Sequence, residues 1–322
     1  MLPIEPVLPE LTQALRSRIS AVLVAPPGAG KTTRVPLALL DEPWLAGRRI
    51  LMLEPRRLAA RSAARYMASS LGEPVGETVG YRVRLESKVG PRTRIEVITE
   101  GVLTRLLQAD PALEHVGAVI FDEFHERSLH ADLGLALCLQ SQSLLREDLR
   151  LLVMSATLDA QPVAALLGDA PMVVSEGRSY PVETRYLSRP VEGRIEPAAA
   201  RAVAEALERE AGDLLVFLPG AGEIRRVEER LVAAGLGAHV RIAPLHGSLP
   251  QEAQDRAIAP SVPGERKVVL ATAIAETSLT VEGVRVIIDS GVMRVPRFSP
   301  RTGMTRLETI PVSRASADQR RG

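Results

Sequence analysis

Short runs of apolar, β-branched residues alternate with longer amphipathic stretches along the chain. In the first half the apolar runs predict strands, and the stretches between them predict helices because their apolar residues recur with helical spacing. The expected strands are 21–25, 50–53, 95–98, 118–121 and 150–154, and the expected helices are 31–40, 57–71, 101–109 and 131–145. Strands and helices that alternate in this way are typical of a mostly parallel sheet covered by helices.

The second half repeats this pattern. The expected strands are 214–218, 240–243, 267–271 and 284–289, and the expected helices are 197–211, 222–234 and 250–258. A polar, proline-interrupted segment near 175–190 separates the halves, so we expect two α/β domains, residues 1–177 and 178–322. An alternating segment at 292–310, with a Pro-Arg-Thr-Gly turn, predicts a β-hairpin near the C-terminus.

Composition excludes several classes of protein. A length of 322 residues fits two domains. The one cysteine, Cys138, excludes an intramolecular disulfide and a cysteine-rich zinc site. The sequence has no apolar run near the ~18 residues of a membrane span and no signal-peptide pattern at its start. A cytoplasmic protein without a membrane partner is therefore expected.

The basic residues are unevenly divided between the two types. The net charge is only +1, but just three of the 40 basic residues are lysines, at positions 31, 88 and 267. Compositional bias explains the many arginines, and phosphate recognition by guanidinium groups is the functional alternative. The scarcity of lysine draws attention to Lys31.

Lys31 lies in the segment 21–33, AVLVAPPGAGKTT, where an expected strand leads through a glycine-containing loop into a helix. This is the arrangement of a P-loop, whose backbone N–H groups and helix N-terminus bind phosphates. Lys31 would reach the β- and γ-phosphates, and Thr32 would ligate Mg²⁺. The strict pattern begins with glycine where this chain has Ala25, and a tight turn without a ligand is the alternative interpretation.

A pair of acidic residues, Asp122 and Glu123, follows the apolar strand 118–121. In a Walker B arrangement the first carboxylate holds Mg²⁺ and the second polarises the attacking water. Alone the pair is a weak signal, because acidic residues at strand ends are common. It is stronger here because it follows a P-loop and precedes the tripeptide Ser-Ala-Thr at 155–157, which ends the next expected strand.

Further segments extend these two motifs over nearly the whole chain. In chain order the segments are APPGAGKTT (25–33), EPRRLAA (54–60), TEG (99–101), DEFHERSLHAD (122–132), SAT (155–157), LVFLPGAGEI (215–224), LHGSLP (245–250), ATAIAETSLTVEG (271–283), SPRTGM (299–304) and SRASADQRRG (313–322). This collinear set resembles the motifs of the DEAH/RHA group of superfamily 2 helicases. The resemblance implies two RecA-like domains that bind and hydrolyse Mg²⁺-ATP, or another NTP, and act on RNA.

The resemblance also implies roles for single residues in nucleotide chemistry. Asp122, Glu123, Lys31 and Gln319 would be catalytic, and His125, Ser155 and Thr157 would couple hydrolysis to domain movement. The implied nucleotide-binding residues are Gly28, Ala29, Gly30, Lys31, Thr32, Thr33, Tyr66, Ile258, Thr280 and Glu282. Tyr66 and Ile258 stand where the family often has the arginine and phenylalanine that stack on adenine, and Glu282 stands where it has aspartate. The choice of NTP therefore stays open.

Contacts with nucleic acid are implied on loops of both domains. The residues are Arg56, Arg57, Arg82, Arg84, Thr99, Gly101, Gly247, Ser248, Thr272 and Thr277. Arg82 and Arg84 belong to a hook-shaped turn, and the hairpin at 292–310 would part the bases. The expected partner is RNA, single-stranded or with an overhang. DNA remains possible, because backbone recognition does not by itself distinguish the sugars.

The family's last motif continues past Gln-Arg-x-Gly to two further arginines, the arginine fingers, whereas this sequence reads Gln319, Arg320, Arg321 and Gly322. We therefore expect a truncated chain of low activity that is poorly ordered near 313–322. Three alternatives to an RNA helicase stay open. They are a translocase that remodels RNA–protein complexes, a DNA-directed helicase and, for the fragment, a nucleic-acid-binding module without catalysis.

Overall fold

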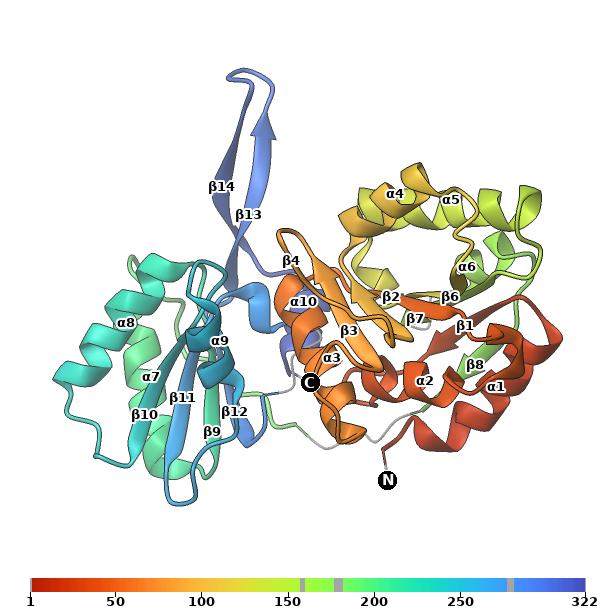
Figure 1. Ribbon diagram of the computed structural model, residues 1–322. Coiled ribbons are helices and arrows are strands. Elements are labelled where there is room, and N and C mark those ends of the chain that lie inside the picture. The colour runs from red at the N-terminus through yellow and green to blue at the C-terminus, as the bar shows by residue number, and fades with distance from the viewer. Residues whose placement is uncertain (1, 157–159, 177–181, 277–280, 322) are drawn as a thin grey trace. The chain divides into compact units, whose positions relative to one another are not determined.

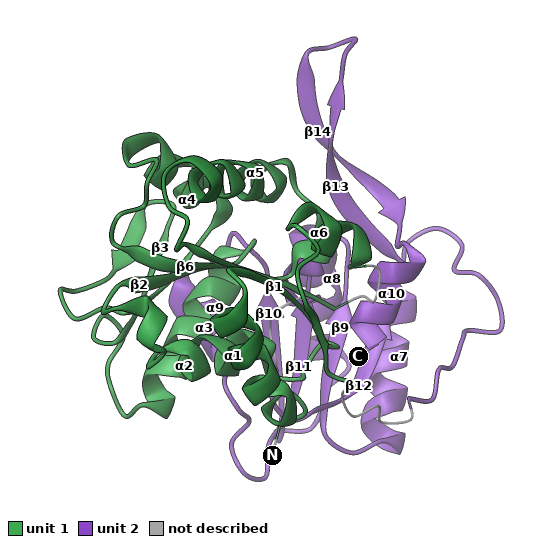
Figure 2. Cartoon of the chain, turned by 90° about the vertical axis from the view of Figure 1, so that its right-hand side faces the viewer, with its two compact units in different colours: residues 1–180 green, residues 181–322 purple. Residues whose placement is uncertain are grey.

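The computed structural model describes residues 2–156, 160–176, 182–276 and 281–321. The chain forms two compact units, Met1–Tyr180 and Pro181–Gly322 (Figure 2). Each unit is a mostly parallel sheet covered by helices, which confirms the expected fold class.

Unit 1 is built on an eight-stranded sheet in the order β4-β3-β5-β2-β6-β7-β1-β8. All neighbouring strands are parallel except β3 and β4, which form an antiparallel hairpin. The strands are β1 (Ser20–Val24), β2 (Arg49–Leu53), β3 (Val79–Val83), β4 (Glu86–Lys88), β5 (Ile95–Ile98), β6 (Val116–Phe121), β7 (Arg150–Ser155) and β8 (Met172–Val174).

Helices cover both faces of this sheet because successive strand residues point to opposite sides. In β1, Ala21 and Leu23 join one core and Val22 and Val24 join the other. The first core includes α1 (Leu8–Ser17), α2 (Lys31–Leu39) and α3 (Arg57–Ser70), and the second includes α4 (Glu100–Ala109), α5 (Leu129–Leu144) and α6 (Gln161–Leu166). Figure 1 shows these two groups of helices on opposite faces of the sheet.

Unit 2 has a smaller, fully parallel sheet in the order β10-β11-β9-β12. Its strands are β9 (Asp213–Phe217), β10 (Val240–Leu245), β11 (Arg266–Ala271) and β12 (Val284–Asp289). The helices are α7 (Glu196–Arg209), α8 (Ala221–Ala233), α9 (Gln251–Ile258) and α10 (Arg314–Arg321). Apolar side chains of α7 and α8 pack on β9 and β11 to form its core.

A long hairpin extends away from the sheet of unit 2 (Figure 1). Its strands, β13 (Val292–Ser299) and β14 (Met304–Pro311), pair in antiparallel register along their whole length, which confirms the expected hairpin. Most of its side chains are exposed, including Phe298 and Leu307.

The sequence pattern missed several elements and was wrong about the end of the chain. The structure adds α1, α6, β3, β4 and β8 to the expected elements. The segment 313–322 was expected to be poorly ordered, but Arg314–Arg321 forms α10. The reason is a buried cation, because Arg320 lies 2.8 Å from Glu276 and 2.9 Å from Asp289 and stacks over Phe217.

The described helices include none that has both the length and the apolar composition of a membrane span. Short 3₁₀ turns complete the structure: η1 (Glu5–Val7), η2 (Pro43–Leu45), η3 (Phe124–Glu126) and η4 (Ala273–Ala275).

Candidate nucleotide and nucleic-acid sites

The loop between β1 and α2 has the backbone of a phosphate-binding loop. Gly28 and Gly30 have φ angles of 74° and 94°, which glycine adopts without the strain that a side chain would add. Ala25, where the strict pattern has glycine, keeps φ outside this region and donates its N–H to the carbonyl of Ser155 at 3.0 Å. Alanine is therefore compatible with this position. Ala29 is buried and Thr33 is half-buried beside the same loop.

Two side-chain contacts join this loop to the acidic pair after β6. The Lys31 Nζ lies 2.9 Å from Glu123 Oε1, and both side chains are about 95% buried, with 4% and 5% exposed. The Thr32 hydroxyl donates to Asp122 Oδ2 at 2.5 Å. Four residues that the sequence places on two distant segments thus meet at the carboxyl ends of β1 and β6, two parallel strands of one sheet.

Negative charge exceeds positive charge around Lys31. Burial, together with the charge of Glu123, raises the pKa of Asp122 to about 6, against the opposing effects of Lys31 and Thr32. Burial lowers the pKa of Lys31, but the charges of Asp122 and Glu123 outweigh it and leave this pKa above its usual value. Glu54, fully buried after β2, acts in the same direction. A site with one cation and three carboxylates favours the arrival of another cation.

The donor atoms in this site suit a magnesium ion. The Thr32 hydroxyl and the Asp122 carboxylate are oxygen ligands, which Mg²⁺ prefers, and this ion usually takes only one or two carboxylates and completes its shell with water and substrate phosphates. The described residues contain no group of three or more His, Cys, Asp or Glu side chains placed to hold a metal ion.

His125 connects the acidic pair to the end of β7. Its Nδ1 accepts the backbone N–H of Ala156 at 3.2 Å, and its Nε2 lies 3.4 Å from Glu123 Oε2. Burial lowers the pKa of His125, and Lys31 lowers it further, while Glu123 opposes the change. Ser155 is buried at the end of β7, and Thr157 lies outside the described residues.

The expected nucleic-acid contacts of unit 1 follow the neighbouring strands of the same sheet. Arg57 is exposed at the start of α3, and the Nη2 of Arg56 lies 3.4 Å from Glu126 Oε2. Thr99 is the residue before α4, and Gly101 is exposed in its first turn. These residues follow β2 and β5, so they lie at the same edge of the sheet as the P-loop.

The expected hook is the β3–β4 hairpin (residues 79–88). Arg84 is exposed at its turn. Arg82 is partly engaged elsewhere, because its Nε lies 2.7 Å from Glu96 Oε1 on β5. The Glu96 side chain is buried and also faces Arg49 of β2 at 3.5 Å, so it lies between two arginines. Arg84 is the more available of the two hook arginines.

In unit 2, exposed Gly247 and Ser248 follow β10, and Thr272 follows the neighbouring β11 and donates its N–H to Leu245 at 3.2 Å. These residues therefore share one edge of the second sheet. Thr277 and Thr280 lie outside the described residues.

The remaining expected residues are spread over both units. Tyr66 is half-exposed on α3 of unit 1. In unit 2, Ile258 ends α9 and is partly buried, Glu282 is exposed before β12, and Gln319 is partly buried on α10. Sequence reasoning missed several buried charged residues, among them Glu54, Asp213 and Lys267. The scarcity of lysine, which singled out Lys31, was also a signal for Lys267.

Comparison with known proteins identifies the class. The family model described as "DEAD/DEAH box helicase" matches residues 7–166, and the "Helicase conserved C-terminal domain" matches residues 198–322. The chain belongs to the DEAD/DEAH box helicases.

Among individual proteins, the ATP-dependent RNA helicase HrpB of Escherichia coli (strain K12) is 56% identical over 321 residues, which are 100% of this chain and 39% of that protein. A crystal structure of the E. coli DEAH/RHA helicase HrpB matches with a TM-score of 0.92, over 100% of this chain and 41% of the other. A structure described as the E. coli DExH-box NTPase HrpB matches with a TM-score of 0.82, over 99% and 39%. Both structures are 56% identical to the chain, which spans about two fifths of these relatives.

The contacts of His125 predict its tautomer and charge. Because Nδ1 accepts a backbone N–H and burial disfavours the charged form, the ring should be neutral at pH 7 with its proton on Nε2. Nitrogen-15 NMR of the imidazole checks this assignment. A ring protonated on Nδ1, or a ring charged at pH 7, would contradict the geometry.

Proposed function

We propose that this chain carries the NTP-hydrolysing core of an ATP-dependent RNA helicase. The observation that carries the proposal is the contact of Lys31 with Glu123 and of Thr32 with Asp122, at the carboxyl edge of a parallel sheet. Ligands of open α/β sheets bind outside the carboxyl ends of the strands. Membership of the DEAD/DEAH box helicases and the name of the E. coli relative support the same activity.

The ion pair of Lys31 suggests how nucleotide binding prepares the general base. The Lys31 Nζ lies 2.9 Å from Glu123 Oε1, and both side chains are buried. A triphosphate at the N-terminus of α2 would offer Lys31 a more highly charged partner, because the loop backbone and Lys31 both face that position. Glu123 would then be available to accept a proton from the attacking water.

Thr32 and Asp122 would hold the magnesium ion. When bound, Mg²⁺ supplies positive charge that offsets the charge developing on the transferred phosphoryl group. The residues contribute oriented oxygen atoms, because Asp122 Oδ1 is already fixed by the N–H of Glu123 at 2.8 Å and Oδ2 by Thr32. His125 would hold the same loop to the end of β7 and so transmit changes at Glu123 to that strand.

The order of the strands supports a nucleic-acid site beside the nucleotide site. The P-loop follows β1, the acidic pair follows β6 and Ser155 ends β7, and these three strands are neighbours in the sheet. Arg56, Thr99 and the hook follow β2, β5 and β3. The two groups meet between β2 and β6. There the ion pair of Arg56 with Glu126 joins one loop from each group, and it offers a direct route from phosphate contact to the acidic pair.

RNA is the partner that we propose, since the E. coli relative is named an RNA helicase. Loop donors on one edge suit the backbone of a single strand. In unit 2, Gly247, Ser248 and Thr272 add donors on loops of the same kind, and the exposed β13–β14 hairpin adds apolar side chains that suit contact with bases. Stimulation by DNA in place of RNA would favour a DNA-directed helicase, and hydrolysis without strand separation would favour a remodelling translocase.

Replacement of the proposed base should separate binding from hydrolysis. Glu123→Gln keeps the size of the side chain but removes its basicity, so phosphate release should fall by about 10²–10⁴-fold while Mg²⁺-nucleotide still binds. Steady-state phosphate release and binding of a fluorescent nucleotide to the full-length protein measure the two quantities. The matched control is Glu114→Gln, because Glu114 is exposed at the opposite end of β6 and should leave both unchanged.

Either of two results would overturn this assignment. Near-normal hydrolysis by Glu123→Gln would place the base elsewhere. Failure of the same variant to bind Mg²⁺-nucleotide would show that Glu123, and not Asp122, holds the metal.

The salt dependence of RNA binding tests whether the loops after β2, β5 and β3 contact the phosphates of RNA. Each phosphate contact on a single strand contributes a slope of about −0.7 in log K against log salt. Arg57→Ala should therefore make the slope less steep by about 0.7, equally for different sequences. Fluorescence anisotropy with labelled single-stranded RNA measures this, and Arg18→Ala, an exposed arginine before β1 at the opposite edge, is the matched control. An unchanged slope in Arg57→Ala would show that Arg57 does not contact phosphate.

A further inference from the structure

Lys267 is a fully buried lysine for which the helicase motifs give no role. It lies near the start of β11, with 0% of its surface exposed. Of the three lysines, Lys31 is buried at the P-loop and Lys88 is exposed on β4. Removal of a charged amine from water is costly unless the protein supplies compensating partners. Packing alone therefore does not explain why a lysine is buried at position 267.

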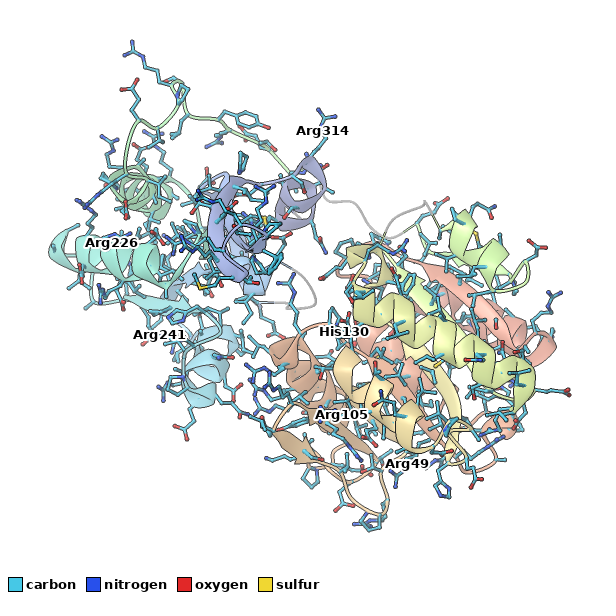
Figure 3. All side chains as sticks on the ribbon, turned by 90° about the horizontal axis from the view of Figure 1, so that it is seen from above. Arg49, Arg105, His130, Arg226, Arg241 and Arg314 are labelled. Atoms are coloured by element: carbon cyan, nitrogen blue, oxygen red, sulfur yellow. The ribbon has the colours of Figure 1, made fainter. Side chains whose placement is uncertain are left out.

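The partner of the Lys267 ammonium is a loop carbonyl. Its Nζ donates to the carbonyl oxygen of Ala259, the residue directly after α9. Burial lowers the pKa of Lys267, and Arg241 of the neighbouring β10, labelled in Figure 3, lowers it further. The charges of Asp213 and Glu282 oppose this change, so both carboxylates lie within electrostatic reach of the amine.

Asp213 is the second member of this buried cluster, with 4% of its surface exposed. Its Oδ1 accepts the backbone N–H of Lys267 at 2.8 Å, and its Oδ2 accepts the hydroxyl of Ser261. Its own N–H donates to the carbonyl of Gly283 at 2.9 Å. Gly283 has a φ of 86°, and a Cβ there would come within 2.9 Å of Asp213 Oδ2, so glycine is required for this close approach.

These hydrogen bonds end on two short segments that carry residues expected to contact the nucleotide. Ala259 directly follows Ile258, which stands where the family packs the base, and Ser261 lies two residues further on. Gly283 directly follows Glu282, which stands where the family contacts the ribose. The buried residues Lys267 and Asp213 are thus hydrogen-bonded to both segments.

We propose that Lys267 and Asp213 are positioning residues that fix the base- and ribose-binding segments 258–261 and 282–283, and so set the affinity of the enzyme for the nucleoside part of its substrate. This inference rests on the proposed function. The residues of this inference all belong to unit 2, and the phosphate loop of unit 1 takes no part in it.

The competing explanation is that Lys267 and Asp213 only stabilise the fold. The neighbouring residue Arg266 provides an example of a stabilising residue. Arg266, one position earlier on β11, donates to the carbonyls of Leu207, Glu210 and Gly212, at 2.6, 2.8 and 3.0 Å. Those bonds hold the end of α7 and the turn that follows it. The bonds of Lys267 and Asp213 instead end on the two segments beside Ile258 and Glu282.

The experiment compares a nucleotide with a ligand that lacks base and ribose. Lys267→Met keeps a straight side chain but removes the amine, and it should raise the KM for ATP about tenfold with little change in kcat. The inhibition constant of inorganic tripolyphosphate should stay unchanged, because the phosphate loop is untouched. Arg266→Met is the matched control, since it should lower thermal stability without raising the KM.

Two further variants decide between failure of the positioning role and failure of the proposed nucleoside contact. They are Ile258→Ala and the double variant Ile258→Ala/Lys267→Met. Ile258→Ala should raise the KM for ATP by itself, and the double variant should raise it little further, because both substitutions act through one segment. If Ile258→Ala raises the KM and Lys267→Met does not, the positioning role is wrong. If neither Ile258→Ala nor Lys267→Met changes the KM, the proposed nucleoside contact of Ile258 is wrong, and the positioning role falls with it.

Should Lys267→Met not fold, Ser261→Ala replaces it, because Ser261 is only partly buried and loses one hydroxyl contact with Asp213. A severalfold rise in KM for ATP, with an unchanged constant for tripolyphosphate, supports the inference. Equal weakening of both ligands by either variant would show a general loss of structure and overturn it.

Discussion

The proposed nucleotide site depends on the interaction of one buried lysine with three carboxylates, whose combined negative charge the lysine cannot neutralise. Lys31 contacts Glu123 and lies in the field of Asp122 and Glu54, and all four residues are at most 5% exposed. Burial, together with the charge of Glu123, raises the pKa of Asp122 to about 6. Excess negative charge favours a divalent cation, which would in turn attract the phosphates of a nucleotide.

The parallel sheet explains why residues far apart in the sequence act at one place. Six neighbouring strands of unit 1, from β3 to β1 in sheet order, run in the same direction, so the loops after them share an edge. The proposed nucleotide residues occupy one half of that edge and the proposed RNA residues the other. The Arg56–Glu126 ion pair lies between the halves, and Glu126 follows Glu123 and His125 in the same short segment. Coupling between the two proposed ligands would therefore pass through adjacent loops.

The sequence predicted the parts of this arrangement that depend on local order. Alternation of apolar runs and amphipathic stretches identified most strands and helices, and P-loop and acidic motifs identified the four central residues. Local pattern failed where distant partners decide the structure. Helix α1 begins Leu8–Pro9, and proline in a first turn loses no hydrogen bond, so this proline does not interrupt the helix. Helix α10 depends on Arg320 reaching Glu276 and Asp289, and β3 and β4 depend on buried Tyr81 reaching Glu86. Burial of Glu54 and Lys267 is likewise a property of the folded chain that no neighbouring residue reveals.

The most direct test of the central claim is hydrolysis of ATP by the full-length protein, measured without nucleic acid, with single-stranded RNA and with single-stranded DNA. We expect RNA to increase phosphate release and Lys31→Ala to abolish it under every condition. Exposed Lys88 provides the control substitution for loss of a lysine. Hydrolysis that persists in Lys31→Ala, or that is indifferent to both nucleic acids, would contradict a nucleotide site coupled to a nucleic-acid site on one sheet edge.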